Sequence, residues 1–301
     1  MTKIFLSITT LLLITLQPTF AQTGSTGLTY LKLGVGGRAL SMGEAYSALA
    51  SDPTATFYNP AALRLSTSSQ ILLMHKEWIQ DTKTEFFGAT TSWNEFSFGV
   101  GVNATSISNI ELRSVPGPPL GTFTARNTSI GISAAYTIDP NLSIGATGKF
   151  IYEKILVDVA SGFAIDLGGL YTTPWDVRLA IVISNLGSIN ELDKTSSKLP
   201  TVVRFGGAYE TLLQDVDGAL TLSSDIVSFS GDSKTHWHLG TEFNYRHTFA
   251  IRAGYQTDYE AKSISGGVGV RYGLLYVDYA FVPFKYDLGA THTFSLGIEF
   301  P

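Results

Sequence analysis

The sequence predicts an all-β protein: a transmembrane antiparallel β-barrel of about 14 strands, with a short helical N-terminal hatch inside the lumen. Three observations lead to this fold class. Apolar and polar residues alternate with period two in run after run, tight and long connections alternate between the runs, and charged side chains fall opposite the apolar face. Thirty glycines, 12% aromatic residues and only 15% charged residues also favour β-structure.

The chain begins with the layout of a signal peptide, residues 1–21. Lys3 precedes an apolar run from Ile4 to Leu16, and small residues end at Ala21. The run is too short for a spanning helix, and no later stretch approaches 18 consecutive apolar residues, which excludes a helical inner-membrane protein. Without cysteine there is no lipoprotein attachment point and no disulfide.

Residues 22–66 are predicted to form the hatch. Within SDPTATFYNPAAL, Asp52 and Asn59 each precede a proline. An Asx side chain caps a helical turn, and a proline needs no N–H partner at the first helical position, so two short helical turns are expected. Four apolar residues upstream share helical spacing: Met42, Ala45, Tyr46 and Leu49. They predict a further helical segment.

Residues 67–301 are predicted to form the barrel. In EFSFGVGVNATS, the apolar residues from Phe96 to Val102 alternate with small or polar ones. About fourteen such runs begin near residues 69, 84, 95, 126, 142, 161, 177, 201, 219, 237, 249, 264, 274 and 292. Most have about 8 to 12 residues, which suits a tilted membrane-spanning strand, and bacterial outer-membrane barrels have an even strand count.

The connections alternate in length. After the even-numbered runs they are tight: WN, DPN, TPWD, LQDVDG, RHT and YG. After five of the seven odd-numbered runs they are longer and loop-like. Outer-membrane barrels have short periplasmic turns and longer outer loops, so the termini are expected in the periplasm and residues 106–125 and 186–200 outside.

Charged side chains are predicted to face the lumen, because charge is costly on the lipid face. They are Asp166, Arg178, Arg204, Asp225, Glu242, Arg252, Arg271, Asp278 and Glu299. Opposite signs on neighbouring strands indicate a neutralising structural lattice; the alternative is a substrate pathway. Many inward positions are glycine, such as Gly99 and Gly145, which leaves space for the hatch to fill.

The stretch GRALSMGEAYSALASDPTATFYNPAAL resembles the N-terminal signature of the PorV/PorQ family, a branch of the FadL-like outer-membrane barrels. The matching residues are Arg38, Ala39, Met42, Gly43, Ala45, Ala48, Asp52, Ala55, Asn59, Pro60, Ala61 and Leu63. The phrases GTFTARNTSIGISAAY, AIDLGGLY, ISNLG, LPTVVRFGGAY and IRAGY extend the resemblance over nearly the whole mature chain. Ala62 departs from the family, which usually has glycine there.

The resemblance implies a non-enzymatic outer-membrane protein linked to type IX protein secretion, with secretion components and secreted cargo proteins as partners. The alternative is a FadL-like passive channel for small hydrophobic molecules. Such a channel needs an apolar pocket by the hatch and a lateral gap, for which the glycine-rich run from Ile264 to Gly269 would permit a kink.

Other motifs point to no enzyme and no cofactor. GVGGRA at 34–39 fits a dinucleotide-binding pattern, but no βαβ unit surrounds it, so its glycines are read as close-packing positions. His236 and His238 flank Trp237 and share a face, but a zinc site needs further ligands, so an exposed pair at a loop end is expected. The net charge of −5 offers no basic face for nucleic acid.

Overall fold

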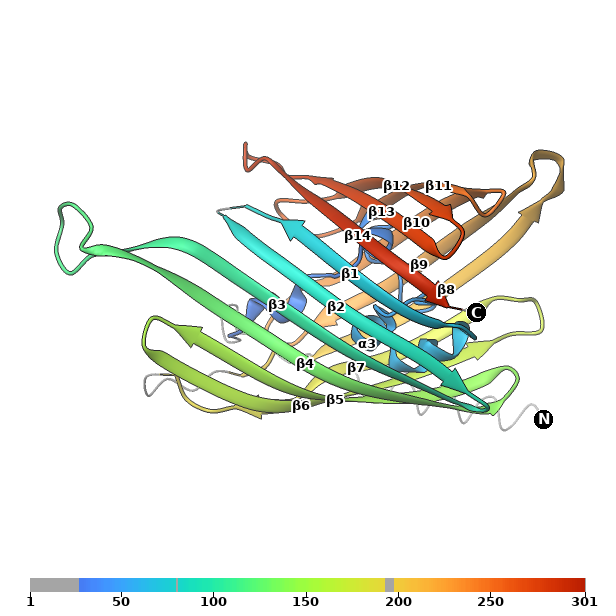
Figure 1. Ribbon diagram of the computed structural model, residues 1–301, viewed down its shortest axis with the longest axis horizontal. Coiled ribbons are helices and arrows are strands. Elements are labelled where there is room, and N and C mark those ends of the chain that lie inside the picture. The colour runs from blue at the N-terminus through green and yellow to red at the C-terminus, as the bar shows by residue number, and fades with distance from the viewer. Residues whose placement is uncertain (1–26, 80, 193–197, 301) are drawn as a thin grey trace.

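A computed structural model describes residues 27–79, 81–192 and 198–300 (Figure 1). The expected signal peptide, residues 1–21, lies outside the described residues. Fourteen antiparallel strands close into one barrel, in which each strand pairs with its sequence neighbours and the first pairs with the last. The predicted fold class is therefore confirmed. Among the described residues, no helix is long and apolar enough to cross a membrane.

The strand bounds lie close to the predicted runs. They are β1 (Ser69–Glu77), β2 (Thr82–Trp93), β3 (Phe96–Leu112), β4 (Gly121–Asp139), β5 (Leu142–Ile155), β6 (Asp158–Thr172), β7 (Arg178–Ile189), β8 (Val202–Leu213), β9 (Gly218–Phe229), β10 (Thr235–Tyr245), β11 (Phe249–Gln256), β12 (Ile264–Tyr272), β13 (Leu275–Pro283) and β14 (Ala290–Phe300). A short 3₁₀ turn, η3 (Gln214–Val216), joins β8 to β9.

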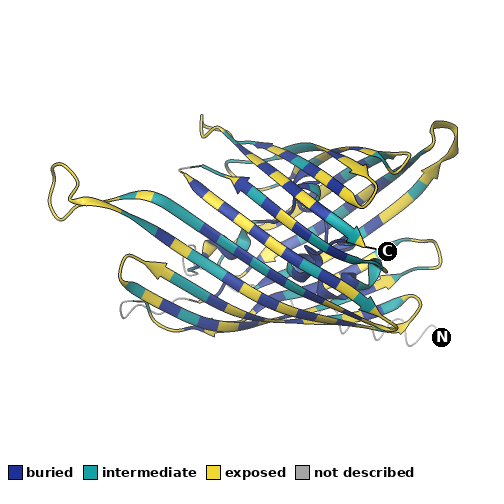
Figure 2. Cartoon of the chain, in the orientation of Figure 1, coloured by how far each residue is buried: buried dark blue, intermediate teal, exposed yellow. Residues whose placement is uncertain are grey.

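The wall has an apolar outer face. Burial alternates along the strands, and Figure 2 shows this as bands of buried and exposed residues. In β2, for example, Phe86 is buried inside while its neighbour Phe87 is exposed outside. Large apolar side chains are exposed outside on strands all around the barrel, including Leu73, Phe98, Ile132, Phe163, Ile181, Phe205, Ile251 and Leu296. So extensive an apolar face suits the hydrocarbon of a bilayer.

The prediction of a loop at 106–125 was wrong in its bounds, because most of these residues belong to β3 and β4, the longest strands of the barrel. Strand β3 continues to Leu112 and β4 begins at Gly121, so only residues 113–120 form the connection. A register shift between Ile107 and Ile110 marks a bulge, with Asn109 at φ 59°. The apolar alternation of the sequence fades here, but the strands continue because backbone pairing does not require apolar side chains. The predicted loop 186–200 likewise loses its first residues to β7, which extends to Ile189.

The hatch lies inside the barrel (Figure 1). Its elements are η1 (Thr29–Lys32), α2 (Gly37–Ser41), α3 (Ala55–Tyr58) and η2 (Pro60–Leu65). The largest fully buried side chains belong mainly to it, including Met42, Tyr46, Leu49 and Tyr58. The main core of the protein therefore lies between the hatch and the wall.

The helical segment predicted around residues 42–49 is not continuous. Helix α2 ends at Ser41, and Gly43 and Glu44 adopt left-handed φ angles of 63° and 60°. A Cβ on Gly43 would approach Leu239 O and Tyr255 N to 3.0 Å each, so the wall imposes this break. Local spacing alone does not reveal that wall.

The two Asx-Pro pairs behave as predicted. Asn59 Oδ1 accepts a hydrogen bond from the Ala61 N–H at 3.0 Å at the start of η2. Asp52 Oδ1 accepts one from the Thr54 N–H at 2.8 Å, just before α3. Each side chain satisfies a backbone donor in the turn that follows its proline.

Candidate functional site

A buried chain of four charges joins the hatch to the wall. Arg38 of α2 donates from Nη2 to Glu242 Oε1 at 2.7 Å and from Nε to Oε2 at 2.9 Å. Glu242 on β10 also pairs with Arg252 on β11, and Arg252 Nη1 lies 2.7 Å from Asp278 Oδ1 on β13. Two positive and two negative groups balance one another, which is how charge is tolerated in a buried setting.

The other predicted lumenal charges lie elsewhere. Asp225 Oδ2 accepts hydrogen bonds from the backbone N–H groups of Tyr46 and Ser47, at 3.3 and 3.0 Å. The Arg204 guanidinium lies 5.5 Å from the centre of the Tyr58 ring. Asp166 pairs with Lys149 at 2.5 Å.

Arg178 and Arg271 lie apart from these groups. Arg178 is 3.6 Å from Glu210, and Arg271 pairs with Glu299. The structure therefore brings four of the singled-out charges together, Arg38, Glu242, Arg252 and Asp278, and distributes the rest around the wall.

The remaining hatch-motif residues pack or cap. Met42 is fully buried, and Asp52 also accepts from the Tyr46 hydroxyl at 2.7 Å. Pro60 and Ala61 lie against β5, where Ser143 Oγ donates to Ala61 O at 3.0 Å. Through these contacts the hatch residues pack against the barrel wall and satisfy its hydrogen bonds.

An apolar cavity lies between the hatch and the edge of the barrel that carries the longer connections, which we call the outer edge. Its volume is about 220 Å³. Its walls are mainly apolar and aromatic: Leu33, Leu40, Trp78, Tyr259, Val282 and Phe284. The Trp78 and Phe284 rings, from two different connections, have centroids 6.3 Å apart. We call this cavity the outer pocket.

Three charged side chains line the inner part of the outer pocket. Glu44 of the hatch accepts a hydrogen bond from Lys262 Nζ at 2.9 Å. Burial disfavours the charged form of Glu44, but Lys262, His238 and Arg204 outweigh it and lower the pKa of the Glu44 carboxyl to about 2. The third group, Lys76 of β1, is only 4% exposed and donates from Nζ to Gly34 O at 2.8 Å.

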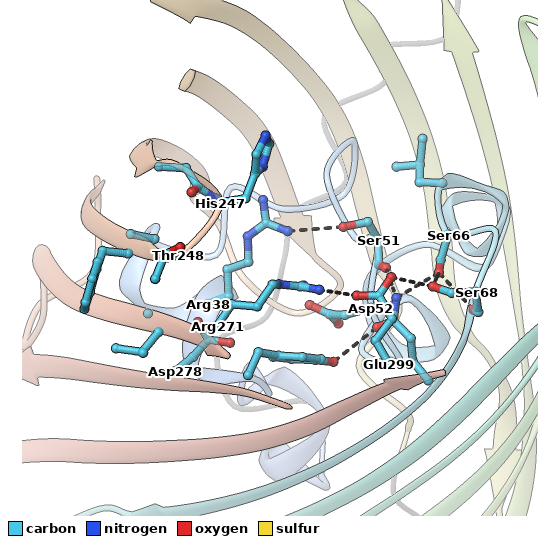
Figure 3. A pocket seen from close by; sticks show the side chains of 18 of the residues that line it. Arg38, Ser51, Asp52, Ser66, Ser68, His247, Thr248, Arg271, Asp278 and Glu299 are labelled. Carbon is cyan, nitrogen blue, oxygen red and sulfur yellow. Dashed lines mark hydrogen bonds and ion pairs between the residues drawn. The ribbon is translucent and has the colours of Figure 1, made fainter. Parts of the chain in front are cut away.

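A second cavity, of about 260 Å³, lies on the other side of α2 (Figure 3). Its lining is polar and includes Arg38, Ser51, Asp52, Arg271 and Glu299, and Arg38 Nη1 donates to Ser51 Oγ at 3.1 Å. His247 and Thr248 of the tight turn at 246–248 line it, together with Arg271 just before the turn at 272–274, so it faces the edge predicted to be periplasmic. We call it the inner vestibule.

The histidine pair corrects a prediction. His236 and His238 share a face as expected, but they are 2% and 0% exposed, and Trp237 points outward. The prediction of an exposed pair at a loop end was wrong because β10 already begins at Thr235. Both imidazoles therefore lie on the lumenal face of this strand. The His236 ring stacks on Tyr259 with centroids 4.0 Å apart. Among the described residues, no cluster of His, Cys, Asp or Glu is arranged to hold a metal ion.

Sequence reasoning did not single out the charges of the outer pocket. Period-two counting in β1 places Lys76 on the inward face with Leu72 and Met74, so one of them was detectable. Glu44 and Lys262 carry no local signal, because one lies in the hatch and the other in a connection. The glycines of GVGGRA do serve close packing: a Cβ on Gly37 would lie 2.8 Å from Asp278 O.

Comparisons with known proteins agree with the barrel. A family model described as an uncharacterised protein family (UPF0164) matches residues 17–163. A search of curated protein sequences gave no match. These results do not confirm the PorV/PorQ resemblance.

Three solved structures illustrate the proteins of similar fold. The CymD monoaromatic hydrocarbon channel aligns with a TM-score of 0.61 and 15% identity, over 88% of this chain and 96% of that chain. The Pseudomonas putida toluene transporter TodX aligns with 0.61 and 13%, over 91% and 98%. A Pseudomonas aeruginosa FadL homologue aligns with 0.54 and 12%, over 88% and 96%. At these identities the likeness establishes a shared fold.

Proposed function

We propose that the protein is a non-enzymatic outer-membrane channel that admits small hydrophobic molecules from outside. The observation that carries this proposal is the outer pocket, an apolar cavity of about 220 Å³ between the hatch and the outer edge of the barrel. Concave apolar cavities with a few polar groups are the usual sites for small molecules. The proposed division is a signal peptide (1–21), a hatch (22–66) and a barrel (67–301).

Two further observations support the proposal. The apolar outer face suits a bilayer, and the solved structures of similar fold include a hydrocarbon channel and a toluene transporter. Hydrophobic solutes are therefore the ligand class with most support.

Passage toward the periplasm would require α2 to move. Leu40 lines the outer pocket while Arg38 lines the inner vestibule, so this helix separates the two cavities. Arg38 is held by Glu242, and the Gly37 N–H donates to Ser295 Oγ at 2.8 Å. We propose that these contacts keep the channel closed at rest.

The experiment compares toluene uptake by cells of a Gram-negative host with and without the protein. Trp78→Ala combined with Phe284→Ala removes both aromatic walls and should lower the added uptake about fivefold or more. Trp93→Ala, on the exposed outer face, serves as the matched control and should leave uptake unchanged. Equal uptake with and without the protein would refute the proposal.

The PorV/PorQ interpretation, with a role in type IX secretion, rests on the hatch signature from Arg38 to Leu63. None of the comparisons supports secretion components or cargo as partners, and the similar folds favour the channel. A pull-down from native outer membrane tests this alternative, because recovery of secretion components would favour it over the channel.

A further inference from the structure

Lys76 is an unusual residue to find in an apolar pocket. Its side chain comes from the inward face of β1 and lines the outer pocket at almost complete burial. An ammonium group has three hydrogen-bond donors. Among the described residues, Gly34 O at 2.8 Å is its only hydrogen-bond partner, and no described carboxylate forms an ion pair with it. A buried charge with so few partners is costly.

No other charged side chain that lines the described pocket forms an ion pair with Lys76. Glu44 is engaged by Lys262 Nζ at 2.9 Å, and Glu260 lies exposed at the rim, where water screens it. On the wall near Glu44, the His238 imidazole contacts the Tyr259 hydroxyl at 3.0 Å, and Arg204 has Asp225 as a nearby negative group. Of the two described lysines that line the pocket, Lys262 is paired with Glu44, whereas Lys76 has no ion-pair partner.

The rest of the pocket sets the size and character of a ligand. Trp78 and Phe284 present aromatic surfaces, and Leu33, Leu40 and Val282 present aliphatic ones. A volume of about 220 Å³ is below the roughly 300 to 1,000 Å³ of pockets for drug-sized ligands. It suits one aromatic ring or a short branched chain and has no room for a long acyl chain.

We infer that the outer pocket selects compact apolar monocarboxylates, with the carboxylate bound to Lys76 and the apolar body between Trp78 and Phe284. This inference rests on the proposed channel function and narrows its ligand class. A carboxylate would complete the hydrogen bonding of Lys76 with a charge-assisted bond. A neutral hydrocarbon would bury the ammonium against apolar atoms and leave its donors unmet.

The test measures equilibrium binding to the purified full chain in detergent by calorimetry, with benzoate and toluene as probes of similar shape. Wild-type protein should bind benzoate more tightly than toluene. Lys76→Met keeps an unbranched side chain that is one atom shorter and removes the charge, so benzoate binding should weaken about tenfold to a hundredfold while toluene binding does not weaken. Lys83→Met, an exposed lysine on the outer face of β2, is the matched control and should change neither affinity.

The outcomes separate the inference from the proposed function. If wild-type protein binds neither probe, the outer pocket is not a ligand site and the proposed function fails with it. If toluene binds but benzoate binds no better, or if Lys76→Met leaves benzoate binding unchanged, this inference alone is overturned.

A second measurement needs no variant and so does not depend on the folding of Lys76→Met. Benzylammonium has nearly the shape of benzoate with the opposite charge. The inference requires the affinity order benzoate, toluene, benzylammonium in wild-type protein, because the Lys76 ammonium attracts a carboxylate and repels a cation. Benzylammonium binding as tightly as benzoate would overturn it.

Discussion

At the scale of single residues, Asn59 connects three parts of the hatch. Its Oδ1 caps η2 through the Ala61 N–H at 3.0 Å, and its Nδ2 donates to Ser47 O at 2.9 Å. The side chain is fully buried, so no water replaces a lost partner. Losing a buried hydrogen-bonding group leaves its former partners unsatisfied, which costs more than the bond itself contributes.

Asn59→Ala should therefore loosen the hatch by about 1–3 kcal/mol without opening the wall. Amide hydrogen exchange in detergent is the measurement, and the amides of residues 59–63 should lose protection while those of β8 and β9 keep theirs. Asn59→Ser is the matched control, because its hydroxyl keeps a capping oxygen while the Nδ2 bonds to Ser47 O and Gly169 O are lost, and no buried charge is introduced. Unchanged exchange in Asn59→Ala would contradict the capping role.

At the scale of elements, helix α2 depends on ionic contacts rather than on its own length. It has only five residues, from Gly37 to Ser41, and isolated helices this short are not stable in water. Its position comes from Arg38 paired with Glu242, and from Ser265 Oγ, which donates to Ser41 O at 3.1 Å. The link between hatch and wall is thus concentrated in a few polar contacts.

A double-mutant cycle tests that link. Arg38→Met leaves Glu242 with Arg252 as its remaining partner, and Glu242→Gln leaves Arg38 without its carboxylate. Each single change should raise conductance in planar bilayers, and the double variant should be less perturbed than the sum of the two, because no uncompensated charge remains between them. Strictly additive effects would show that the two groups do not act as a pair.

Each strand also has an outer face that can be tested. Ile181, on the outer face of β7, is 49% exposed, so Ile181→Arg should cost about 2–4 kcal/mol of folding free energy if it lies near the bilayer midplane. Thr211→Arg, on β8 near the edge with tight turns, is the control and should cost only about 0–1 kcal/mol. Refolding into lipid vesicles across a denaturant series measures both. Equal stability of Ile181→Arg and the parent would mean that the face is assigned wrongly.

At the scale of the whole molecule, the wall and the hatch are stabilised differently. The wall closes on itself through fourteen strand pairings, including β1 with β14 from Ser69↔Phe300 to Glu77↔His292. A closed barrel satisfies its backbone hydrogen bonds internally. The hatch instead depends on contacts with the wall, such as the packing of Ala61 against Gly145.

Deleting residues 38–62 should therefore leave an assembled barrel with an open lumen. Single-channel conductance should rise, together with outer-membrane permeability to large antibiotics, because the two cavities are joined once nearly all of α2, all of α3 and the first half of η2 are gone. Heat-modified migration on gels checks assembly independently. An assembled deletion variant with unchanged conductance would refute the hatch as the closing element.

The wall and the turns of the hatch could be predicted from local patterns in the sequence. Strand number, the two faces and the Asx caps are local properties, because a strand repeats every two residues and a cap spans two or three. The break after α2, the burial of His236 and His238, and the outer pocket with Lys76 became evident only from the folded barrel. These depend on which residues meet across the lumen, and Arg38 meets Glu242, or Glu44 meets Lys262, only after the strands have closed around the hatch. Residues so far apart in the sequence do not recur at a regular spacing, so no local sequence pattern predicts that they meet.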